Sequence, residues 1–437
     1  MVTGDQNILK AWGSPKHVLA PMVDGSELAW RMLGRQYGVQ LTYTPMIHSV
    51  MFLKDKKYRK SCLQFSPSDR PLIAQFCANS PDSFVKAAKL VEPFCDAVDL
   101  NLGCPQGIAK RGHYGAFLQD EWDLLTSILK QAVRHLSVPV TCKIRVFSDV
   151  ERTVEYAKML ETAGASLLVV HGRTREMKGH LTGLADWSQI KRIKEVVHIP
   201  VIANGNIQYP RDVQRCLDET GADAVMSAEG HLHNPAIFAG LQPPVFSVSL
   251  EYLKFATDYP CPMSIVRGHL FKICHYALDE HPEFRSLIGF GQTTEELSEI
   301  VRKMEAVCSN CKTNTNPMVP LPHWICQPYE RPLAGSPRTL SSSTQEGHDS
   351  STKTLAIADN ARLKEQRRLR REEKREKKLA KRAASALPRP LCAHCQTNFR
   401  GSLCPNMGCG QCCPIIDLER SKECPNHRHA KKTKTSV

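Results

Sequence analysis

Short apolar runs alternate with amphipathic stretches along the first half of the chain. Eight runs of four to six residues, rich in Val, Ile, Leu and Ala, predict strands, and the stretches between them have the apolar spacing of helices. This alternation predicts βαβ units and a parallel sheet. The predicted strands are residues 17–22, 41–44, 72–76, 97–101, 139–144, 167–171, 200–204 and 223–227.

Two properties of these strands favour a closed TIM (β/α)8 barrel over an open, doubly wound sheet. There are eight of them, and several are apolar throughout, as expected of strands that are buried on both faces. The fold class is therefore predicted to be α/β, with the barrel occupying residues 1–242.

The pattern changes after the barrel. Residues 243–330 lose the strand signal and show apolar residues at helical spacing, which predicts a small helical domain. Residues 331–390 join a stretch rich in Ser, Thr, Pro and Gly to a run of basic residues, which predicts a disordered linker with a basic helix. Residues 391–430 are dense in Cys and form a separate module.

Polar residues stand at or near the C-terminal ends of five predicted strands, where TIM-barrel enzymes place their chemistry. A sheet built only for packing would rarely repeat that placement five times. An active site is therefore expected at this mouth of the barrel. The five residues are Gln75, Asn101, Lys143, His171 and Asn204.

The chain of 437 residues has a net charge of +14, and more than half of it lies in residues 362–382, with twelve basic and four acidic residues. This run is either a solubilising charged face or a segment that contacts RNA or directs nuclear import, and the net charge favours a polyanionic partner. No segment has the roughly 18 consecutive apolar residues that a membrane helix needs. We expect a soluble protein of the cytoplasm or nucleus.

Eighteen cysteines without an export signal indicate free thiols or metal ligands rather than a disulfide framework. Cys104 stands out because it follows a predicted buried strand and lies between Gly103 and Pro105, ahead of a glycine-rich basic loop. Most lone cysteines are inert core residues. This context instead predicts a thiol that projects at the barrel mouth.

Four motifs occur in order at the ends of predicted strands: APMVD at 20–24, LNLGCP at 100–105, HGRT at 171–174 and NGN at 204–206. With HWICQPY at 323–329 and the C-terminal cysteines, they closely resemble the tRNA dihydrouridine synthases, in particular the eukaryotic class that modifies uridines 16 and 17 of the tRNA D-loop. The resemblance implies an oxidoreductase that binds FMN, uses NADPH or NADH, and reduces uridine to 5,6-dihydrouridine in tRNA.

The same resemblance implies a set of cofactor contacts. A cation such as Lys143 suits the site where negative charge accumulates on a reduced flavin, and glycines after the last two strands suit a phosphate. Around the ring and ribityl chain the implied residues are Ala20, Pro21, Met22, Gln75, Lys143 and His171. Around the phosphate they are Asn204, Gly205, Asn206, Ala228, Glu229 and Gly230.

One of these turns departs from the family pattern. The family usually has Gly-Arg after the eighth strand, with the arginine facing the phosphate, whereas this chain has Ala228-Glu229-Gly230. A glutamate would repel a phosphate. Either backbone amides suffice, or Arg173 or another basic group compensates.

Cys104 is expected to donate a proton to C5 of uracil while the reduced flavin passes hydride to C6. An ordinary cysteine thiol is mostly protonated at neutral pH, which suits an acid. The target uridine must be extruded from the folded tRNA while phosphate contacts hold the rest. Candidate contacts, each with solvated surface charge as the alternative, are Lys110, Arg111, Arg145, Arg267, His269 and Lys272.

The C-terminal cysteines have the spacing of tetrahedral zinc sites, with reduced, metal-free thiols as the alternative. A module of about 40 residues usually needs such a metal to fold, so the zinc would be structural. The candidate ligands are Cys392, Cys395, Cys404, Cys409, Cys412, Cys413, Cys424 and His427. The isolated pair Cys308 and Cys311 is expected to be unrelated to metal, because nothing near it in the sequence completes a site.

Two other functions compete with this hypothesis. An FMN barrel that acts on a small pyrimidine, such as a dihydroorotate-type oxidoreductase, would need neither the basic run nor the cysteine-rich module. A non-catalytic RNA-binding scaffold would explain Glu229, but Cys104, Lys143 and His171 count against it.

Overall fold

The computed structural model describes residues 7–309, 311, 320–329, 391–393, 396 and 407. The chain divides into two compact units, Met1–Leu340 and Ser341–Val437. The predicted linker at 331–390 lies outside the described residues, as does most of the predicted module at 391–430. Neither the linker nor the module is therefore tested, and both stay predictions.

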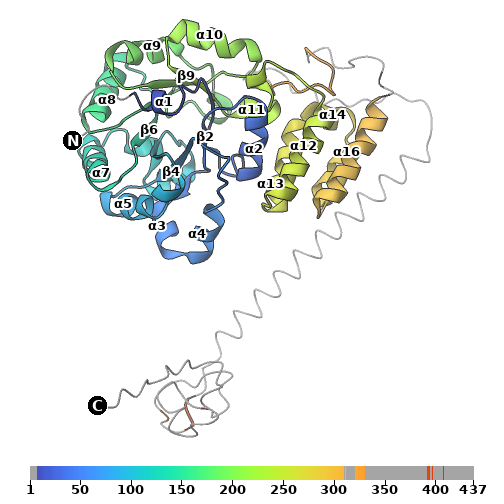
Figure 1. Cartoon of the computed structure of the whole chain (residues 1–437), viewed down its shortest axis with the longest axis horizontal. Coiled ribbons are helices and arrows are strands. Elements are labelled where there is room, and N and C mark those ends of the chain that lie inside the picture. Colours follow the sequence, from blue (N-terminus) through green and yellow to red (C-terminus); the bar gives the residue numbers. More distant parts are fainter. Residues whose placement is uncertain are drawn as a thin grey trace. The chain divides into compact units, whose positions relative to one another are not determined.

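Eight parallel strands form the predicted barrel, which confirms the fold class (Figure 1). The sheet runs in the order β1, β9, β8, β7, β6, β5, β4 and β2, and a parallel bridge between Val18 and Leu41 brings its two ends together. A short strand that the pattern did not predict, β3, pairs with β4. The bounds are β1 His17–Leu19, β2 Thr42–Tyr43, β3 Ile47–His48, β4 Leu72–Cys77, β5 Ala97–Leu102, β6 Val140–Arg145, β7 Leu168–His171, β8 Val201–Asn204 and β9 Ala224–Ser227.

Helices surround the barrel, and several begin at a polar cap (Figure 1). The Asp149 carboxylate accepts the backbone N–H groups that open α8, and Asp186 does the same for α9, which satisfies donors that a helix start leaves unpaired. The bounds are α1 Ile8–Ala11, α2 Leu28–Gln36, α3 Ser49–Lys54, α4 Lys56–Cys62, α5 Pro81–Lys89, α6 Gly107–Gly112, α7 Trp122–His135, α8 Val150–Thr162, α9 Trp187–Val196, α10 Pro210–Thr220 and α11 Glu229–His233. Short 3₁₀ turns are η1 Glu92–Phe94, η2 Gly115–Leu118, η3 Gly179–Leu181 and η4 Ile237–Ala239.

The barrel strands bury both faces, which explains why several of their sequences are apolar throughout. Along β7, Val169 belongs to the cluster that fills the barrel, whereas Leu168 and Val170 belong to the cluster between the sheet and the outer helices. Along β8, Ile202 points inward in the same way. This period of two is the geometry of a pleated strand.

A helical region follows the barrel, as predicted, and packs against it through contacts between α12 and α2 (Figure 1). Its helices are α12 Val245–Asp258, α13 Met263–Ile273, α14 His275–Glu280, α15 Glu283–Phe290 and α16 Thr294–Cys308. The segment 320–329 lies against the start of α12, where Val245 N donates to Trp324 O at 2.8 Å and Cys326 N donates to Pro243 O at 2.9 Å. Among the described residues, no helix is both long and apolar enough to cross a membrane.

Candidate active site

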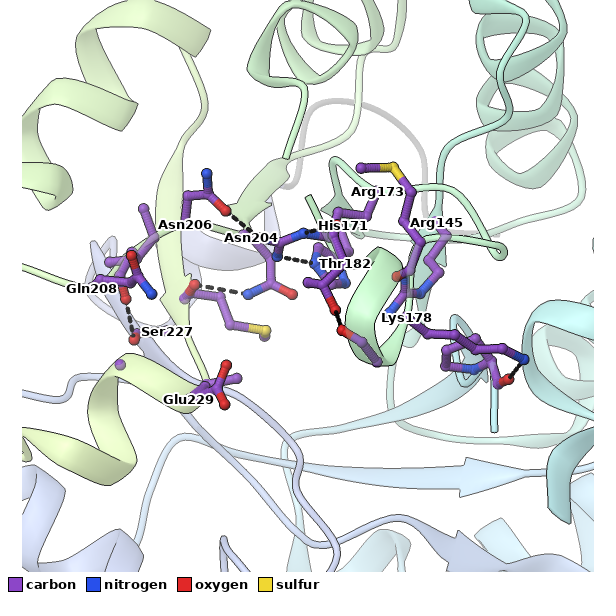
Figure 2. Close-up of a pocket in the computed structure, with 18 of the residues that line it drawn as sticks. Arg145, His171, Arg173, Lys178, Thr182, Asn204, Asn206, Gln208, Ser227 and Glu229 are labelled. Atoms are coloured by element: carbon purple, nitrogen blue, oxygen red, sulfur yellow. Dashed lines mark hydrogen bonds between the residues drawn. The ribbon is translucent and has the colours of Figure 1, made fainter. Parts of the chain in front are cut away.

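A cavity of about 370 Å³ opens at the C-terminal ends of the barrel strands (Figure 2). Its walls come from the loops after β5, β7, β8 and β9 and from the end of β6, so residues far apart in the sequence meet there. The lining residues are Pro105, Gln106, Arg145, His171, Arg173, Met177, Lys178, Gly179, Thr182, Asn204, Gly205, Asn206, Ile207, Gln208, Met226, Ser227, Ala228, Glu229 and Gly230. The predicted mouth of the barrel is therefore where a pocket lies.

Cys104 is half-buried beside this cavity, and the Asn101 side chain holds its backbone. Asn101 Oδ1 accepts from Gly103 N at 3.2 Å and from Cys104 N at 3.0 Å. Ala116 N donates to Cys104 O at 3.1 Å. Gly115 follows Tyr114 with φ +67, and a Cβ there would lie 2.8 Å from Cys104 O. The thiol therefore sits on a backbone that is fixed from both sides.

Two cations of the cavity wall bind the carbonyls on either side of Cys104. Arg145 Nε donates to Gly103 O at 2.8 Å. Lys178 Nζ donates to Pro105 O at 2.7 Å (Figure 2). The loop after β7, which carries Lys178, is thus tied to the loop that carries the thiol. Such a supporting shell restricts the positions that the thiol can adopt.

A buried polar chain inside the barrel supports Asn101. Asn101 Nδ2 donates to Gln75 Oε1 at 2.9 Å, and Gln75 Nε2 donates to Asp99 Oδ2 at 2.9 Å. Thr141 Oγ1 donates to Asp99 Oδ1 at 2.6 Å. Burial raises the pKa of Asp99 to about 6, and the bonds from Thr141 and Gln75 limit the rise. Asp99 and Thr141 were not among the predicted site residues, although an aspartate inside the apolar strand AVDLN was a signal.

Lys143 on β6 reaches past one strand, β7, to Asn204 on β8. Its Nζ donates to Asn204 Oδ1 at 2.8 Å, and Asn204 Nδ2 donates to Met226 O at 2.9 Å. Burial, together with the nearby Arg145 guanidinium, lowers the pKa of Lys143 to about 8. At neutral pH a lysine with this pKa is mostly protonated. Its positive charge suits a site where negative charge accumulates.

His171 and Arg173 form the basic side of the cavity (Figure 2). Arg173 NH1 lies 3.0 Å from His171 Nε2, and Arg173 NH2 also donates to Asn206 Oδ1. Burial first, and then the charges of Lys143, Arg145 and Arg173, hold the pKa of His171 well below its usual value. His171 is therefore a neutral ring at physiological pH.

Two glycines let the loops after β7, β8 and β9 approach one another at the cavity. A Cβ on Gly205, whose φ is +115, would lie 2.6 Å from Ala185 Cβ. A Cβ on Gly230 would lie 2.2 Å from Ile207 O and 3.0 Å from Gln208 Cα. No other residue fits either position without movement of the backbone or of a packed neighbour.

Glu229, which stands in the turn where an arginine is usual, lies in the cavity wall. Figure 2 shows it at the start of α11, apart from His171 and Arg173. Arg145, Arg173 and Lys178 line the same cavity, so three cations face one carboxylate. The cavity can therefore still attract an anion.

Five of the implied cofactor residues do not line this cavity. Ala20 is buried in the barrel, and its N–H donates to Ser227 O at 3.0 Å beside the cavity wall. Gln75 and Lys143 reach the cavity region only through the hydrogen bonds described above. The five are Ala20, Pro21, Met22, Gln75 and Lys143.

The predicted tRNA contacts are divided between surface and interior. Lys110 and Arg111 are exposed on α6, next to the Cys104 loop. His269 is fully buried and stacks on Trp30 with ring centroids 4.1 Å apart, so its assignment as a phosphate contact was wrong. The apolar face of α13 packs inward and takes this histidine with it.

The remaining three predicted contacts already bind backbone carbonyls. Arg267 NH1 donates to Gly291 O at 2.8 Å, and Lys272 Nζ donates to Gly268 O at 3.3 Å. Arg145 is buried in the cavity wall rather than exposed on the outer surface. Its position therefore favours a contact with the contents of the cavity.

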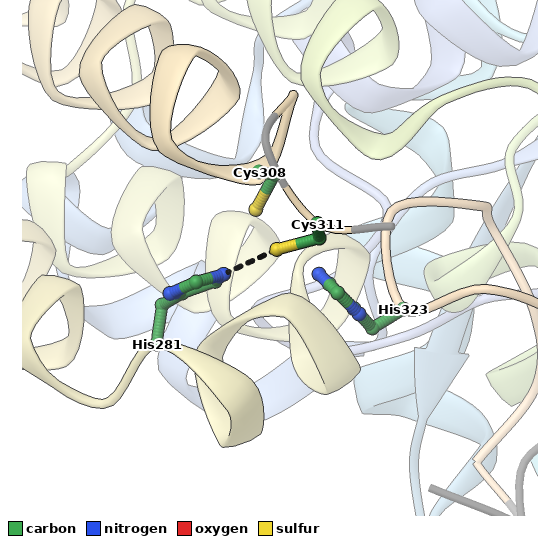
Figure 3. Close-up of side chains that lie close together, drawn as sticks. All are labelled: His281, Cys308, Cys311 and His323. Atoms are coloured by element: carbon green, nitrogen blue, oxygen red, sulfur yellow. Dashed lines mark hydrogen bonds between the residues drawn. The ribbon is translucent and has the colours of Figure 1, made fainter. Parts of the chain in front are cut away.

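The metal predictions have two different outcomes. Of the candidate ligands in the C-terminal module, only Cys392 is among the described residues, so that set stays a prediction. Cys308 and Cys311 were expected to be unrelated to metal because nothing near them completes a site, but in the fold His281 and His323 lie beside them and offer two further side chains of metal-binding type (Figure 3). These two histidines come from distant segments, which sequence spacing does not reveal.

Comparison with known proteins identifies a family that this chain matches. The dihydrouridine synthase (Dus) family matches residues 18–313. A tRNA-dihydrouridine(16/17) synthase-like protein of Mus musculus, with NAD(P)(+) in its name, is 46% identical over 434 residues, which cover 97% of this chain and 89% of the mouse protein. The tRNA-dihydrouridine(16/17) synthase of Saccharomyces cerevisiae is 45% identical over 74% of this chain and 85% of its own length. A tRNA-dihydrouridine(20a/20b) synthase-like protein of Homo sapiens is 38% identical over 58% of this chain and 80% of its own length.

Proposed function

Because the chain belongs to the dihydrouridine synthase family, we propose that it reduces uridine to 5,6-dihydrouridine in tRNA, with FMN as its flavin and NADPH or NADH as the reductant. The target positions are 16 and 17 of the D-loop. Relatives named for these positions match this chain at higher identity and over more of its length than those named for 20a and 20b. A cytoplasmic or nuclear location stays a prediction.

The observation that carries this proposal is the cysteine beside a basic cavity at the mouth of a parallel barrel. Cys104 adjoins the cavity through Pro105, and Arg145, Arg173 and Lys178 line it. A dihydroorotate-type enzyme, which acts on a small substrate, would belong to another family. The hypothesis of a non-catalytic RNA-binding scaffold predicts no flavin turnover. The spectroscopic experiment described below distinguishes it from the synthase hypothesis.

The chemistry of the cavity fits FMN. The close approach at Gly205 and Gly230 leaves backbone that can face a phosphate, and Arg173 supplies the charge that Glu229 does not. Lys143 provides a cation next to Asn204. We propose that these residues hold FMN together with Ala20, Pro21, Met22, Gln75, His171, Asn206 and Ala228. Bound there, FMN would accept hydride from the nicotinamide and supply it to C6 of the uracil.

The chain's own contribution to the reaction is the proton. The Cys104 thiol donates it to C5 of the uracil, and the resulting thiolate is reprotonated from solvent, which the half-buried side chain can reach. Lys110 and Arg111 lie on exposed α6 close to this thiol and are proposed to hold tRNA phosphates while the uridine is extruded. The charged groups of the cavity wall orient the substrate and exclude bulk water.

Asn101 is proposed to be a positioning residue for Cys104. An Asn101→Ala variant should lower the rate of dihydrouridine formation roughly 10- to 100-fold, because it removes the acceptor of two backbone N–H groups and misplaces the thiol. The rate at which NADPH reduces the flavin should change little. Single-turnover measurements of the two half-reactions would test this, and an equal loss in both would contradict it.

The proposed function is tested by the visible spectrum of the purified full chain under anaerobic conditions. We expect a flavin band that bleaches with NADPH and recovers when unmodified tRNA is added. A tRNA with cytidine at positions 16 and 17 is the matched control and should not restore the band. Bound tRNA without any flavin band would favour the scaffold hypothesis, and recovery with the control tRNA would overturn the assignment to positions 16 and 17.

A further inference from the structure

Four metal-ligating side chains converge in the helical region, outside the site described above (Figure 3). His281 directly follows α14, Cys308 ends α16, Cys311 lies three residues further on, and His323 belongs to the segment 320–329. One ligand atom from each lies within 4.8 Å of all the others. Two thiols and two imidazoles are the donor set of a tetrahedral zinc site.

The spacing of the ligand atoms matches a single ion. Zinc binds sulfur at about 2.3 Å and imidazole nitrogen at about 2.0–2.1 Å, so tetrahedral ligand atoms lie about 3.3–3.8 Å apart. Cys311 Sγ lies 3.5 Å from His281 Nε2, within this range. Every separation is within 4.8 Å, so metal binding requires a contraction of no more than about 1–1.5 Å.

His323 provides an independent observation. Its side chain is 4% exposed, and neither ring nitrogen has a hydrogen-bond partner among the described residues. A buried polar atom without a partner costs free energy, so such a residue calls for an explanation. A metal ion bound by His323 and Cys308 would give one of these ring nitrogens a partner. Cys308 is also 4% exposed.

His281 is already oriented as a metal ligand. A Glu283 carboxylate oxygen lies 3.6 Å from His281 Nδ1, and Nε2 faces Cys311 on the other side of the ring. Ligating histidines commonly place a carboxylate on the nitrogen that does not bind the metal. The ring therefore presents the correct nitrogen to the cluster.

We propose that His281, Cys308, Cys311 and His323 bind one structural Zn²⁺ ion. Four protein ligands close the coordination shell, so the ion has no open position for catalysis. It joins the end of α16 and the segment 320–329 to the turn between α14 and α15. That segment also bonds to Pro243 and Val245 at the start of α12, so the metal fastens the returning chain onto the helical region.

The first test is the zinc content of the full chain after dialysis against EDTA. The Cys311→Ser and His281→Ala variants should each contain about one zinc fewer per chain than the wild type, whatever the C-terminal module contributes. Cys311→His, which restores a ligand, should regain it. His275→Ala is the matched control, because His275 is also a half-buried histidine of the same helical region but lies outside the cluster. Unchanged zinc in both ligand variants would overturn the proposal. If the variants instead lose one equivalent of a different metal, the assignment to zinc would be overturned.

A second test needs no variant and so does not depend on the folding of one. The wild-type chain is alkylated with and without a strong chelator, and tryptic peptides are measured by mass spectrometry. Cys308 and Cys311 share the peptide 304–312, whereas the reference Cys261 lies alone in the peptide 255–267. Chelator should increase labelling of Cys311 at least tenfold and leave Cys261 unchanged. Equal labelling of Cys311 in both conditions would overturn the proposal.

Discussion

Replacing Cys104 by alanine should lower dihydrouridine formation about 10²- to 10⁴-fold, the usual contribution of a positioned general acid. The flavin content and the rate of flavin reduction by NADPH should stay close to the wild type. The thiol adjoins the cavity but is not among its lining residues, so its removal leaves the proposed cofactor contacts in place. Flavin spectra of the purified variant and quantification of dihydrouridine in its tRNA product would measure both effects.

Cys77→Ala is the matched control for this variant. Cys77 belongs to the same small cluster as Cys104 but is buried at the end of β4. Burial raises the pKa of the Cys77 thiol to about 12, so it is a poor acid. We expect its replacement to leave tRNA reduction near the wild-type rate. Loss of flavin from Cys104→Ala would instead identify Cys104 as a structural residue and remove it from the mechanism.

Gly230→Ala should weaken FMN binding by roughly 5- to 150-fold, which corresponds to about 1–3 kcal/mol for overpacking a fixed position. The added Cβ would lie 2.2 Å from Ile207 O, an atom of the loop after β8. Because that atom belongs to the backbone, it cannot move aside by a side-chain rotation. The loops after β8 and β9 must therefore separate. Titration of the flavin-free variant with FMN would measure the loss.

Gly268→Ala controls for the substitution itself. Gly268 lies inside α13, where the added Cβ would meet only the end of the Lys272 side chain at 3.9 Å. Alanine is favoured over glycine in a helix by roughly 0.5–1 kcal/mol, so this variant should be slightly more stable and bind FMN normally. If Gly230→Ala binds FMN as tightly as Gly268→Ala, the turn after β9 does not hold the cofactor.

The sequence by itself determined the barrel and the place of Cys104 at its mouth. Strand patterns are local, because side chains alternate between faces every second residue and a strand buried on both faces is apolar at most positions. The eight runs therefore located the eight strands of the barrel, although β3, with only two residues, is too short to leave such a pattern. Cys104 could be found because it lies two residues after one of these strands, β5.

The tertiary structure alone decided which side chains meet. The chain from Asp99 through Gln75 to Asn101 crosses two strands, and hydrogen bonds between strands leave no spacing in the sequence. The burial of His269 also could not be predicted from the sequence, because its stacking partner Trp30 belongs to a distant helix, α2, of the barrel.

The cluster of His281, Cys308, Cys311 and His323 also depends on tertiary structure. Cys308 and Cys311 form a recognisable local pair, but His281 lies 27 residues before Cys308 and His323 lies 12 residues after Cys311. Packing of α14, α16 and the segment 320–329 brings a nitrogen or sulfur atom of each of the four side chains within 4.8 Å of the others. Local periodicity determines which elements form, whereas the contacts between elements depend on how their apolar faces pack, and a single sequence does not encode that packing in any fixed spacing.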